Sequence, residues 1–600
     1  MGRTNISQSI ILLIFFLNVI LFLPVFFPNL SEINKFDESI YINGGRILIE
    51  DTLPIYSSNP MVAILYALIY IPVQTSPYWL IHSCTIGRFI LFALLWLGSY
   101  LIAKEMSPLS HPLFMISLLF VSPILINLLG NPSDALFAAM SAFAFWQILS
   151  FYHSKRLSHL WKSSVFVALA ALSRNDGLVL FAILILISFL INLFVKFESK
   201  ITFRRINISL IACTTPFVII ISSYILIYGL ITGNFEFGTT KRSYVAFEQG
   251  QGVAYSHLYS TRNPYVEGQV EARRLFGTPE ENRYSVINAI SRNPKAFLER
   301  VVQIAKKAPY QCLSIYGGAG TGLLLFLLVG RGMIKMARCK LYLLLCISLL
   351  WSLHLIIYFA FFFRGSYFLL PYFVVLSLAS IGLASMVRNF ESRKERYLWS
   401  TTLFGLAALG IGFNEARLFV SSLIFLLGLW SIWIIISQYE NHKAIIPIGL
   451  VLTVFVVSLT AKGYPSPKFR TLGIAPDEKA ALFMKEHLEP GARVGAYAPG
   501  NVWLPKMTYV PMYLNLRYIN SNEDLLAWML NQKVEAIYVD EALKNFEPSL
   551  WMLIFAAESL SRKSGKALAR RRPYGRAEGA SRSLPVLWRA SILPGDAWMF

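Results

Sequence analysis

Residues 10–27 read IILLIFFLNVILFLPVFF and residues 178–195 read LVLFAILILISFLINLFV, and neither run contains a charged side chain. A helix of about 20 such residues crosses the ~30 Å hydrocarbon core of a bilayer. Comparable apolar runs recur from residue 9 to residue 461. The first run is longer than a signal-peptide core and lacks a small-residue cleavage site, so we interpret it as a retained helix. The chain is therefore predicted to be a polytopic integral membrane protein.

The composition agrees with this prediction. Of 600 residues, 56% are hydrophobic and 14% are charged, whereas soluble proteins carry about 25% charged residues. The formal net charge of +21 comes mostly from Lys and Arg in short loops between spans, where they set orientation. We therefore expect no nucleic-acid partner. The five cysteines are scattered without metal or redox spacing.

Hydropathy predicts about thirteen transmembrane helices. They lie near residues 8–28, 84–103, 112–129, 134–151, 161–173, 178–195, 208–231, 313–330, 341–363, 367–387, 398–413, 418–437 and 444–461. Basic residues fall on alternate loops if the N-terminus is cytoplasmic. Loops 29–83 and 232–312 are then extracytoplasmic, and residues 61–72 within the first are expected to form an amphipathic interfacial helix. We expect a multi-pass protein of a prokaryotic plasma membrane with an extracytoplasmic C-terminus.

The chain changes character after this membrane domain, which spans 1–461. Residues 462–557 alternate helix patterns (478–487, 525–533) with strand patterns (493–498, 536–539), which predicts a small extracytoplasmic α/β domain. The basic tail, 558–600, is rich in Arg, Ala, Gly and Ser. We interpret this tail as disordered or as the product of a frameshift.

Ionisable residues gather at the predicted outer ends of the spans. They are Asp37, Glu38, Arg88, Asp134, Arg174, Asp176, Arg364, Glu415 and Arg417. Charges at helix ends often merely meet water, but arginines in very short outer turns run against the positive-inside bias. We therefore expect these groups to share one polar cavity. His354 is the one clear ionisable residue at mid-membrane depth, where a helix-to-helix hydrogen bond is favoured over a proton relay.

Such a cavity suits an anionic lipid head group and a hydroxyl nucleophile. Arg presents a planar fork to phosphate oxygens, and fixed cations stabilise a phosphate leaving group. A carboxylate can accept the proton of the attacking hydroxyl, and Asp37 is the best candidate because it lies in an outer loop. The partners expected are a polyprenyl-phosphate-linked sugar donor, a hydroxyl acceptor at the outer face and membrane lipids.

Several short motifs resemble a known family. Asp37-Glu38, Tyr41, Gly44-Gly45 and Leu53-Pro54-Ile55-Tyr56 look like the first outer loop of GT-C glycosyltransferases, on the branch of protein O-mannosyltransferases and bacterial lipid A aminoarabinose transferases. Residues 131–134 and 172–177 are similar to the family's acidic and basic turns, and residues 363–371 to its stretch near the lipid phosphate. The motifs keep the family's order along the chain.

The resemblance implies roles for these residues. Asp37, Glu38 and Asp134 are the candidate catalytic residues, and Arg88, Arg174, Arg364 and Tyr367 the candidate ligands of the lipid phosphate. A divalent cation, Mg²⁺ or Mn²⁺, is the one cofactor that the resemblance leaves open. The expected activity is transfer of a hexosyl or pentosyl group.

Two alternatives belong to other classes. A transporter or flippase could have as many spans and bind the same lipid, but it would place ionisable groups near the midplane in paired repeats. The sequence shows no midplane carboxylate and no convincing repeat. A structural or assembly protein would predict that Asp37→Asn leaves function intact.

Overall fold

The structure is a computed structural model. It describes residues 26, 38–50, 59–110, 112–121, 124–198, 203–233, 235, 240–255, 264–316, 318–360, 363–389, 484–486, 488, 491–496, 506, 508–511, 531–534, 536–539, 586–589, 591–592 and 598–599. Asp37 and the spans expected at 8–28, 398–413, 418–437 and 444–461 fall outside the described residues.

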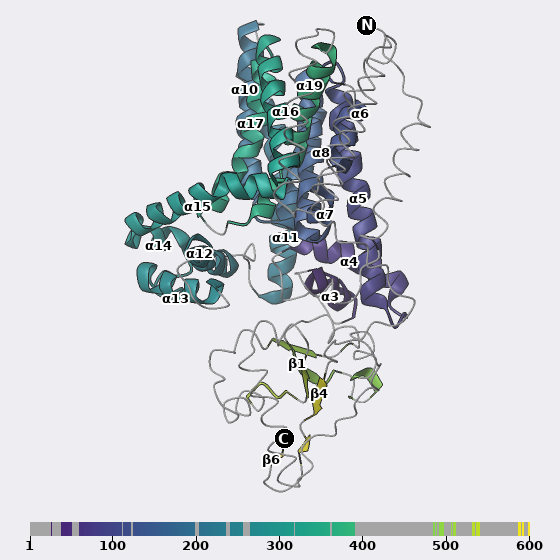
Figure 1. The fold of residues 1–600 in the computed structure, drawn as a ribbon, viewed down its shortest axis with the longest axis vertical. Helices are drawn as coiled ribbons and strands as arrows, with labels where there is room; N and C mark the ends of the chain where they lie inside the picture. Colours follow the sequence, from purple (N-terminus) through teal and green to yellow (C-terminus); the bar gives the residue numbers. More distant parts are fainter. Residues whose placement is uncertain are drawn as a thin grey trace, which may run out of the picture. The chain divides into compact units, whose positions relative to one another are not determined.

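The described part of the first 389 residues is helical (Figure 1). Its elements are α3 (Glu38–Glu50), α4 (Pro60–Val73), α5 (Trp79–Glu105), α6 (Pro112–Val121), α7 (Ile124–Leu129), α8 (Pro132–Ser154), α9 (Leu157–Ser173), α10 (Gly177–Glu198), α11 (Phe203–Thr232), α12 (Thr240–Ala254), α13 (Pro264–Phe276), α14 (Val286–Arg292), α15 (Pro294–Ile315), α16 (Gly318–Arg338), α17 (Tyr342–Ser352), the 3₁₀ turn η1 (Leu353–Leu355), α18 (Ile356–Ala360), the 3₁₀ turn η2 (Gly365–Leu369) and α19 (Tyr372–Asn389).

Within the described residues, five segments are long and apolar enough to cross a membrane. They are Trp79–Glu105, Pro132–Ser154, Gly177–Phe194, Ile206–Ile231 and Tyr342–Phe359. Each coincides with a predicted span. The span expected at 313–330 begins later than predicted, because α15 continues to Ile315 and α16 starts at Gly318. A multi-span helical protein is thus confirmed, while the total of about thirteen helices stays a prediction.

The close crossing of α16 and α19 requires a glycine on each helix. α8 packs against α9, which also contacts α10 and α11, and α16 packs along α19. A Cβ added at Gly332 of α16 would lie 1.9 Å from the carbonyl oxygen of Leu378, and one at Gly382 of α19 would lie 1.9 Å from that of Leu328. Only glycine lets two helix backbones approach this closely.

The first-loop helix predicted at 61–72 is present as α4. It is apolar on every side, because Ile64, Leu68 and Ile71 are exposed while Tyr66 and Tyr70 are buried. The prediction of a helix is confirmed, and the prediction that the helix is amphipathic is wrong.

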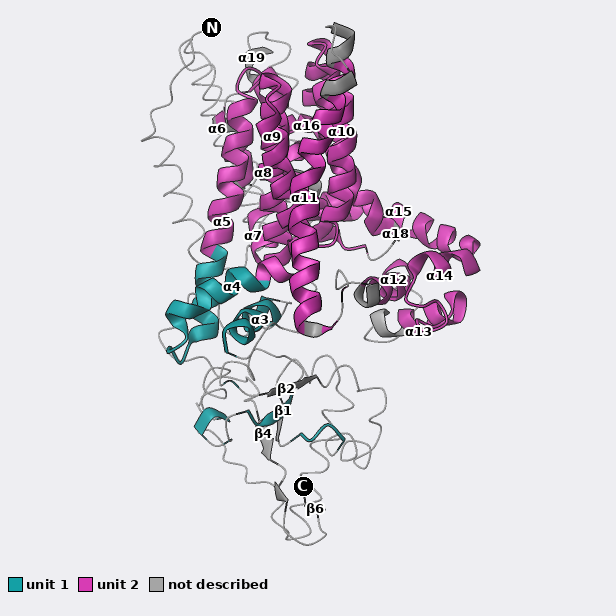
Figure 2. Cartoon of the chain, turned by 180° about the vertical axis from the view of Figure 1, so that it is seen from behind, with its two compact units in different colours: residues 1–52, 63–88, 468–600 teal, residues 53–62, 89–467 magenta. Residues whose placement is uncertain are grey.

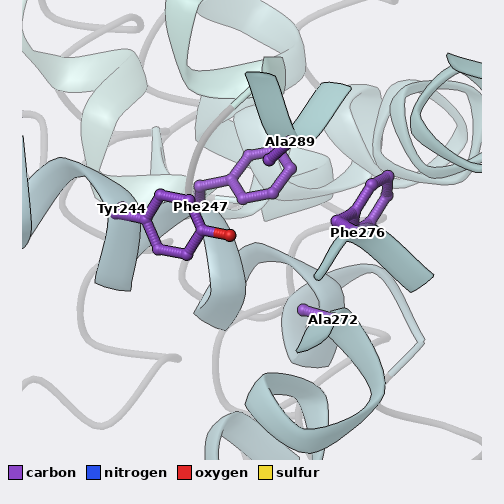
Figure 3. Packing of buried hydrophobic residues seen from close by; sticks show 5 residues of the cluster. All are labelled: Tyr244, Phe247, Ala272, Phe276 and Ala289. Atoms are coloured by element: carbon purple, nitrogen blue, oxygen red, sulfur yellow. The ribbon is translucent and has the colours of Figure 1, made fainter. Parts of the chain in front are cut away.

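The chain divides into two compact units, which are considered separately (Figure 2). The first comprises residues 1–52, 63–88 and 468–600, and the second comprises residues 53–62 and 89–467. In the second unit, α12–α15 form a helical subdomain with its own apolar core (Figure 3). The core contains Tyr244, Phe247, Ala272, Phe276 and Ala289.

The described C-terminal residues include a small sheet. Its strands are β1 (Arg493–Ala496), β2 (Thr508–Pro511), β3 (Ala536–Val539) and β4 (Val586–Arg589), in the order β2-β1-β3-β4. β1 pairs in parallel with β2 and β3, aligning Val494 with Tyr509 and Ala536, whereas β4 runs antiparallel to β3. A two-stranded sheet joins β5 (Ser591–Ile592) and β6 (Trp598–Met599). The strands predicted near 493–498 and 536–539 are confirmed as β1 and β3.

Candidate active site

A cluster of charged and aromatic side chains lies where α8, α9 and α10 begin or end. We call Asp134, Arg174, Asp176, Tyr358 and Tyr367 the Arg174 cluster. All five residues belong to the second unit. Asp134 lies in the first turn of α8, after a proline at the helix start, where a carboxylate is favoured by the helix dipole.

The turn that carries Arg174 depends on a glycine. α9 ends at Ser173, Arg174 caps it with extended backbone, and α10 starts at Gly177. A Cβ at Gly177 would lie 2.3 Å from the backbone nitrogen of Ala171. The glycine therefore allows the chain to reverse within three residues, which places Arg174 and Asp176 side by side.

Arg174 is held between two carboxylates. Its Nη1 donates to Asp134 Oδ1, and its Nε donates to Asp176 Oδ2 at 2.8 Å. Asn131 Nδ2 donates to the second oxygen of Asp134 at 3.1 Å, and the Tyr358 hydroxyl donates to Asp176 Oδ2. Each carboxylate therefore has two donors, as a buried charge requires.

Two tyrosine rings enclose the guanidinium. The Arg174 Cζ lies 4.8 Å from the ring centroid of Tyr367 and 5.9 Å from that of Tyr358. The two rings stack on each other with centroids 4.2 Å apart. This arrangement joins α18 and η2 to the turn after α9 through a cation–π contact.

The Arg174 cluster carries a net negative charge. Two carboxylates face one guanidinium, and Asp134 is only 2% exposed. Burial alone would lower the pKa of Arg174, but Asp134, Tyr358 and Asp176 raise this pKa well above its ordinary value. Arg174 is thus a permanent cation whose first function in this structure is to hold Asp134 and Asp176.

His354 lies one helical turn before Tyr358, at the 3₁₀ interruption between α17 and α18. It is fully buried, and its Nδ1 is 2.8 Å from the carbonyl oxygen of Trp351. A carbonyl only accepts, so Nδ1 carries the proton. The expected helix-to-helix hydrogen bond is wrong, since the 3₁₀ turn brings a carbonyl of the same segment within reach.

A second buried ion pair belongs to the first unit. Glu38, the first residue of α3, is 0% exposed and receives two hydrogen bonds from Arg88 of α5. Arg88 Nε lies 3.0 Å from Oε1, and Nη2 lies 2.7 Å from Oε2. Such a two-pronged bond is the strongest geometry of a carboxylate and a guanidinium. Arg88, a candidate ligand for phosphate, already binds a carboxylate here.

Tyr66 of α4 lies beside this pair. Its hydroxyl is buried and has no hydrogen-bond partner among the described residues. Burial and then the charge of Glu38 raise the pKa of Tyr66 well above its usual value, so the hydroxyl stays protonated. A Cβ at Gly87 would lie 2.6 Å from the Tyr66 ring, so the glycine makes room for it.

Arg364 and Tyr367 are the remaining predicted residues within the part of the chain that the structure describes. Arg364 precedes η2 with an exposed side chain, and it makes no ion pair in the part of the chain that the structure describes. Tyr367 joins the Arg174 cluster instead. Because Glu38 and Arg88 lie in one unit and Asp134 and Arg174 in the other, the single cavity expected from the sequence stays a prediction.

Sequence reasoning missed part of the Arg174 cluster. Asp176 was expected in the shared polar cavity, but it was not named among the catalytic or phosphate-binding candidates. Tyr358 lies in an aromatic run of the sequence, and no feature of that run indicates which ring contacts a carboxylate. Among the described residues, no group of three or more His, Cys, Asp or Glu could hold a metal ion.

No protein-family model and no curated protein sequence matches this chain. Comparison with solved structures shows a fold similar to that of ArnT, so the resemblance read from the sequence motifs is confirmed for the fold.

One solved structure supports this similarity of fold. It is ArnT from Cupriavidus metallidurans bound to undecaprenyl phosphate, with a TM-score of 0.52, 10% sequence identity and coverage of 97% of this chain and 98% of that chain. The oligosaccharyltransferase of Archaeoglobus fulgidus in its apo form has a TM-score of 0.48 and 12% identity, covering 90% of this chain and 70% of that chain. The second score is too low to add to the argument.

Proposed function

We propose that the protein is an integral membrane glycosyltransferase that moves a sugar from a polyprenyl-phosphate donor to a hydroxyl acceptor at the outer face of the membrane. The observation that supports this most is the Arg174 cluster, in which Asp134 and Tyr358 are buried, at the helix ends of a GT-C fold. Removing ionisable groups from water costs free energy, and functional sites are where such groups are often retained, so two carboxylates held by one arginine indicate a chemical site.

In the proposed reaction, the acceptor oxygen forms a bond to the anomeric carbon of the donor. The bond from that carbon to the phosphate oxygen breaks, and the leaving polyprenyl phosphate keeps the electron pair. The acceptor's proton passes to a carboxylate. Asp37 is our candidate for this base in the first loop, and Asp134 is a second carboxylate that Arg174 holds in position.

The three arginines have different roles in this proposal. Arg364 is exposed and can offer its fork to the lipid phosphate, where a cation stabilises the charge that develops on the leaving group. Arg174, committed to two carboxylates, fixes their geometry and reaches the phosphate only through Tyr367 or by exchanging a partner. Arg88 holds Glu38 in the same way in the first unit.

We propose further that the full chain has about thirteen spans, an N-terminus in the cytoplasm and an extracytoplasmic α/β domain at 462–557. Its membrane would be a prokaryotic plasma membrane. The sugar donor is a hexosyl or pentosyl polyprenyl phosphate. A divalent cation, Mg²⁺ or Mn²⁺, is the candidate cofactor, and Asp37 is a candidate ligand for it.

A flippase for the same lipid is the alternative from another class. It would move the donor across the bilayer and leave the sugar–phosphate bond intact. The fold favours the transferase, because the structural neighbour that carries the comparison is a transferase with undecaprenyl phosphate bound.

Mass spectrometry of lipid-linked sugars, glycolipids and glycans from cells with and without the gene tests the proposal. A transferase predicts that one extracytoplasmic sugar modification disappears while its polyprenyl-linked donor accumulates. Asp134→Asn and Arg364→Gln should reproduce this pattern, and Arg274→Gln, an exposed arginine on α13, should not. An unchanged set of glycoconjugates would contradict the proposal.

A further inference from the structure

α15 has two faces of different character. Arg300, Ile304 and Ala308 are buried, and they follow one another at intervals of four residues. The opposite face carries Leu298, which is 63% exposed, and Val302, which is 44% exposed. Ala305 and Pro309 are exposed on the same side. We call Leu298, Val302, Ala305 and Pro309 the α15 stripe, since residues three and four apart share a helix face.

The buried face is committed to the subdomain core. The Arg300 guanidinium lies 4.2 Å from the ring centroid of Phe247, and its Nη1 donates to the Phe247 carbonyl at 2.9 Å. Lys307 Nζ donates to the carbonyl of Ala254 at 2.6 Å. These contacts fix the rotation of α15 about its own axis, so the α15 stripe cannot turn inward.

Figures 1 and 2 both show α15 running sideways from the membrane-spanning helices, with α12, α13 and α14 on the side away from those helices. The C-terminal end of α15 contacts α16 and η2. Since the buried face packs on α12, the other helices of the subdomain leave the α15 stripe uncovered.

Basic residues border the α15 stripe. Lys295 and Lys306 are exposed and lie on the same edge of it, and Tyr310 is 76% exposed on that side. Glu299 lies on this edge too, and its negative charge offsets one of the two lysine charges. An apolar stripe with lysines and an aromatic ring at its border is typical of helices that lie in the head-group region of a bilayer.

We propose that α15 lies on the outer surface of the bilayer, with Leu298 and Val302 among the acyl chains and Lys295 and Lys306 on the head groups of anionic phospholipids. This binding surface is independent of the proposed transferase activity. It anchors the α12–α15 subdomain at a fixed depth beside the turn that carries Arg364.

Nitroxide spin labels test the depth of the stripe. Cysteines are placed one at a time at Leu298, Val302 and Arg274, after the five native cysteines have been replaced by alanine. The full chain is reconstituted in vesicles of phosphatidylcholine mixed with phosphatidylglycerol. We expect labels at 298 and 302 to be accessible to oxygen and shielded from an aqueous nickel chelate, and the label at 274 to show the reverse. Equal access of the nickel chelate to all three sites would overturn the proposal.

The lysine contribution is measured at position 302. In vesicles of phosphatidylcholine alone, and in a Lys295→Gln/Lys306→Gln variant, the ratio of oxygen to nickel accessibility should fall severalfold toward the value at position 274. The control variant Arg274→Gln/Arg283→Gln removes the same charge from the exposed surface of the subdomain and should leave the ratio unchanged. A ratio that ignores both the lipid and the lysines would overturn the assignment of an anionic head group.

Discussion

Removing Arg174 should be far more damaging than removing either of its carboxylate partners. Arg174→Gln leaves the buried Asp134 and the half-buried Asp176 with two negative charges and no cation. Breaking a buried ion pair in this way costs about 3–5 kcal/mol. Asp134→Asn instead leaves Arg174 paired with Asp176 at 2.8 Å, so the loss is that of one charged hydrogen bond, about 1.5–3 kcal/mol.

The order of stability can be read from apparent melting temperatures of purified variants in one detergent. We expect wild type to be highest, Asp134→Asn lower and Arg174→Gln lowest. Arg274→Gln removes an exposed arginine whose side chain is 71% accessible, and it should leave the melting temperature close to that of the wild type. If Arg174→Gln melts at or above Asp134→Asn, the two carboxylates do not depend on Arg174 and the description of the Arg174 cluster is wrong.

Three further perturbations have distinct readouts. Gly332→Ala should lower the melting temperature, because its methyl group would meet a backbone oxygen at 1.9 Å, whereas Gly330→Ala, with nothing within 4 Å, should not; equal effects would contradict the close helix crossing. Glu50 accepts from Lys506 at 2.7 Å. Burial raises the pKa of Glu50, but the hydrogen bond from Lys506 and its other partners lower it below 4.5 overall, so the contact should weaken as the pH falls through the lowered value. Burial lowers the pKa of Lys506, but Glu50 raises it above 10.5 overall, so the contact is lost again above that value. The protection of backbone amides near residue 506 from hydrogen exchange, relative to their intrinsic rates, should therefore fall at both extremes of pH. Protection that does not change with pH would contradict the ion pair. Arg364→Gln should raise the KM for the polyprenyl donor several-fold with little change in melting temperature, since the side chain is exposed; an unchanged KM would remove Arg364 from the phosphate site.

The sequence predicted those features of the fold that depend on hydrophobicity along the chain. α5, α8, α10 and α11 match predicted spans, because a bilayer fixes how long an apolar helix must be. The boundary between α15 and α16 was misplaced, because α15 is itself apolar near its end and hydropathy cannot separate two consecutive helices. α4 was predicted as a helix, but its apolar exposed side was not foreseen.

The candidate site was predicted less completely. Asp134 and Arg174 were expected in one cavity and Tyr367 was named as a ligand of the phosphate, and the structure places all three in contact. The pairing of Glu38 with Arg88 joins residues 50 positions apart, and Tyr358 reaches Asp176 across 182 positions. Such contacts depend on how helices pack against each other, which a single sequence does not specify. The base proposed for the reaction, Asp37, remains a prediction from sequence.

The most direct test of the central claim follows the sugar–phosphate bond itself. Purified protein is incubated with a pool of polyprenyl-phosphate-linked sugars and cell-envelope acceptors, and the release of free polyprenyl phosphate is measured by mass spectrometry. The account predicts release by the wild type, together with loss of release in Asp134→Asn and Asp37→Asn. Donor that stays intact while the reconstituted protein carries it across the bilayer would contradict the transferase and identify a flippase.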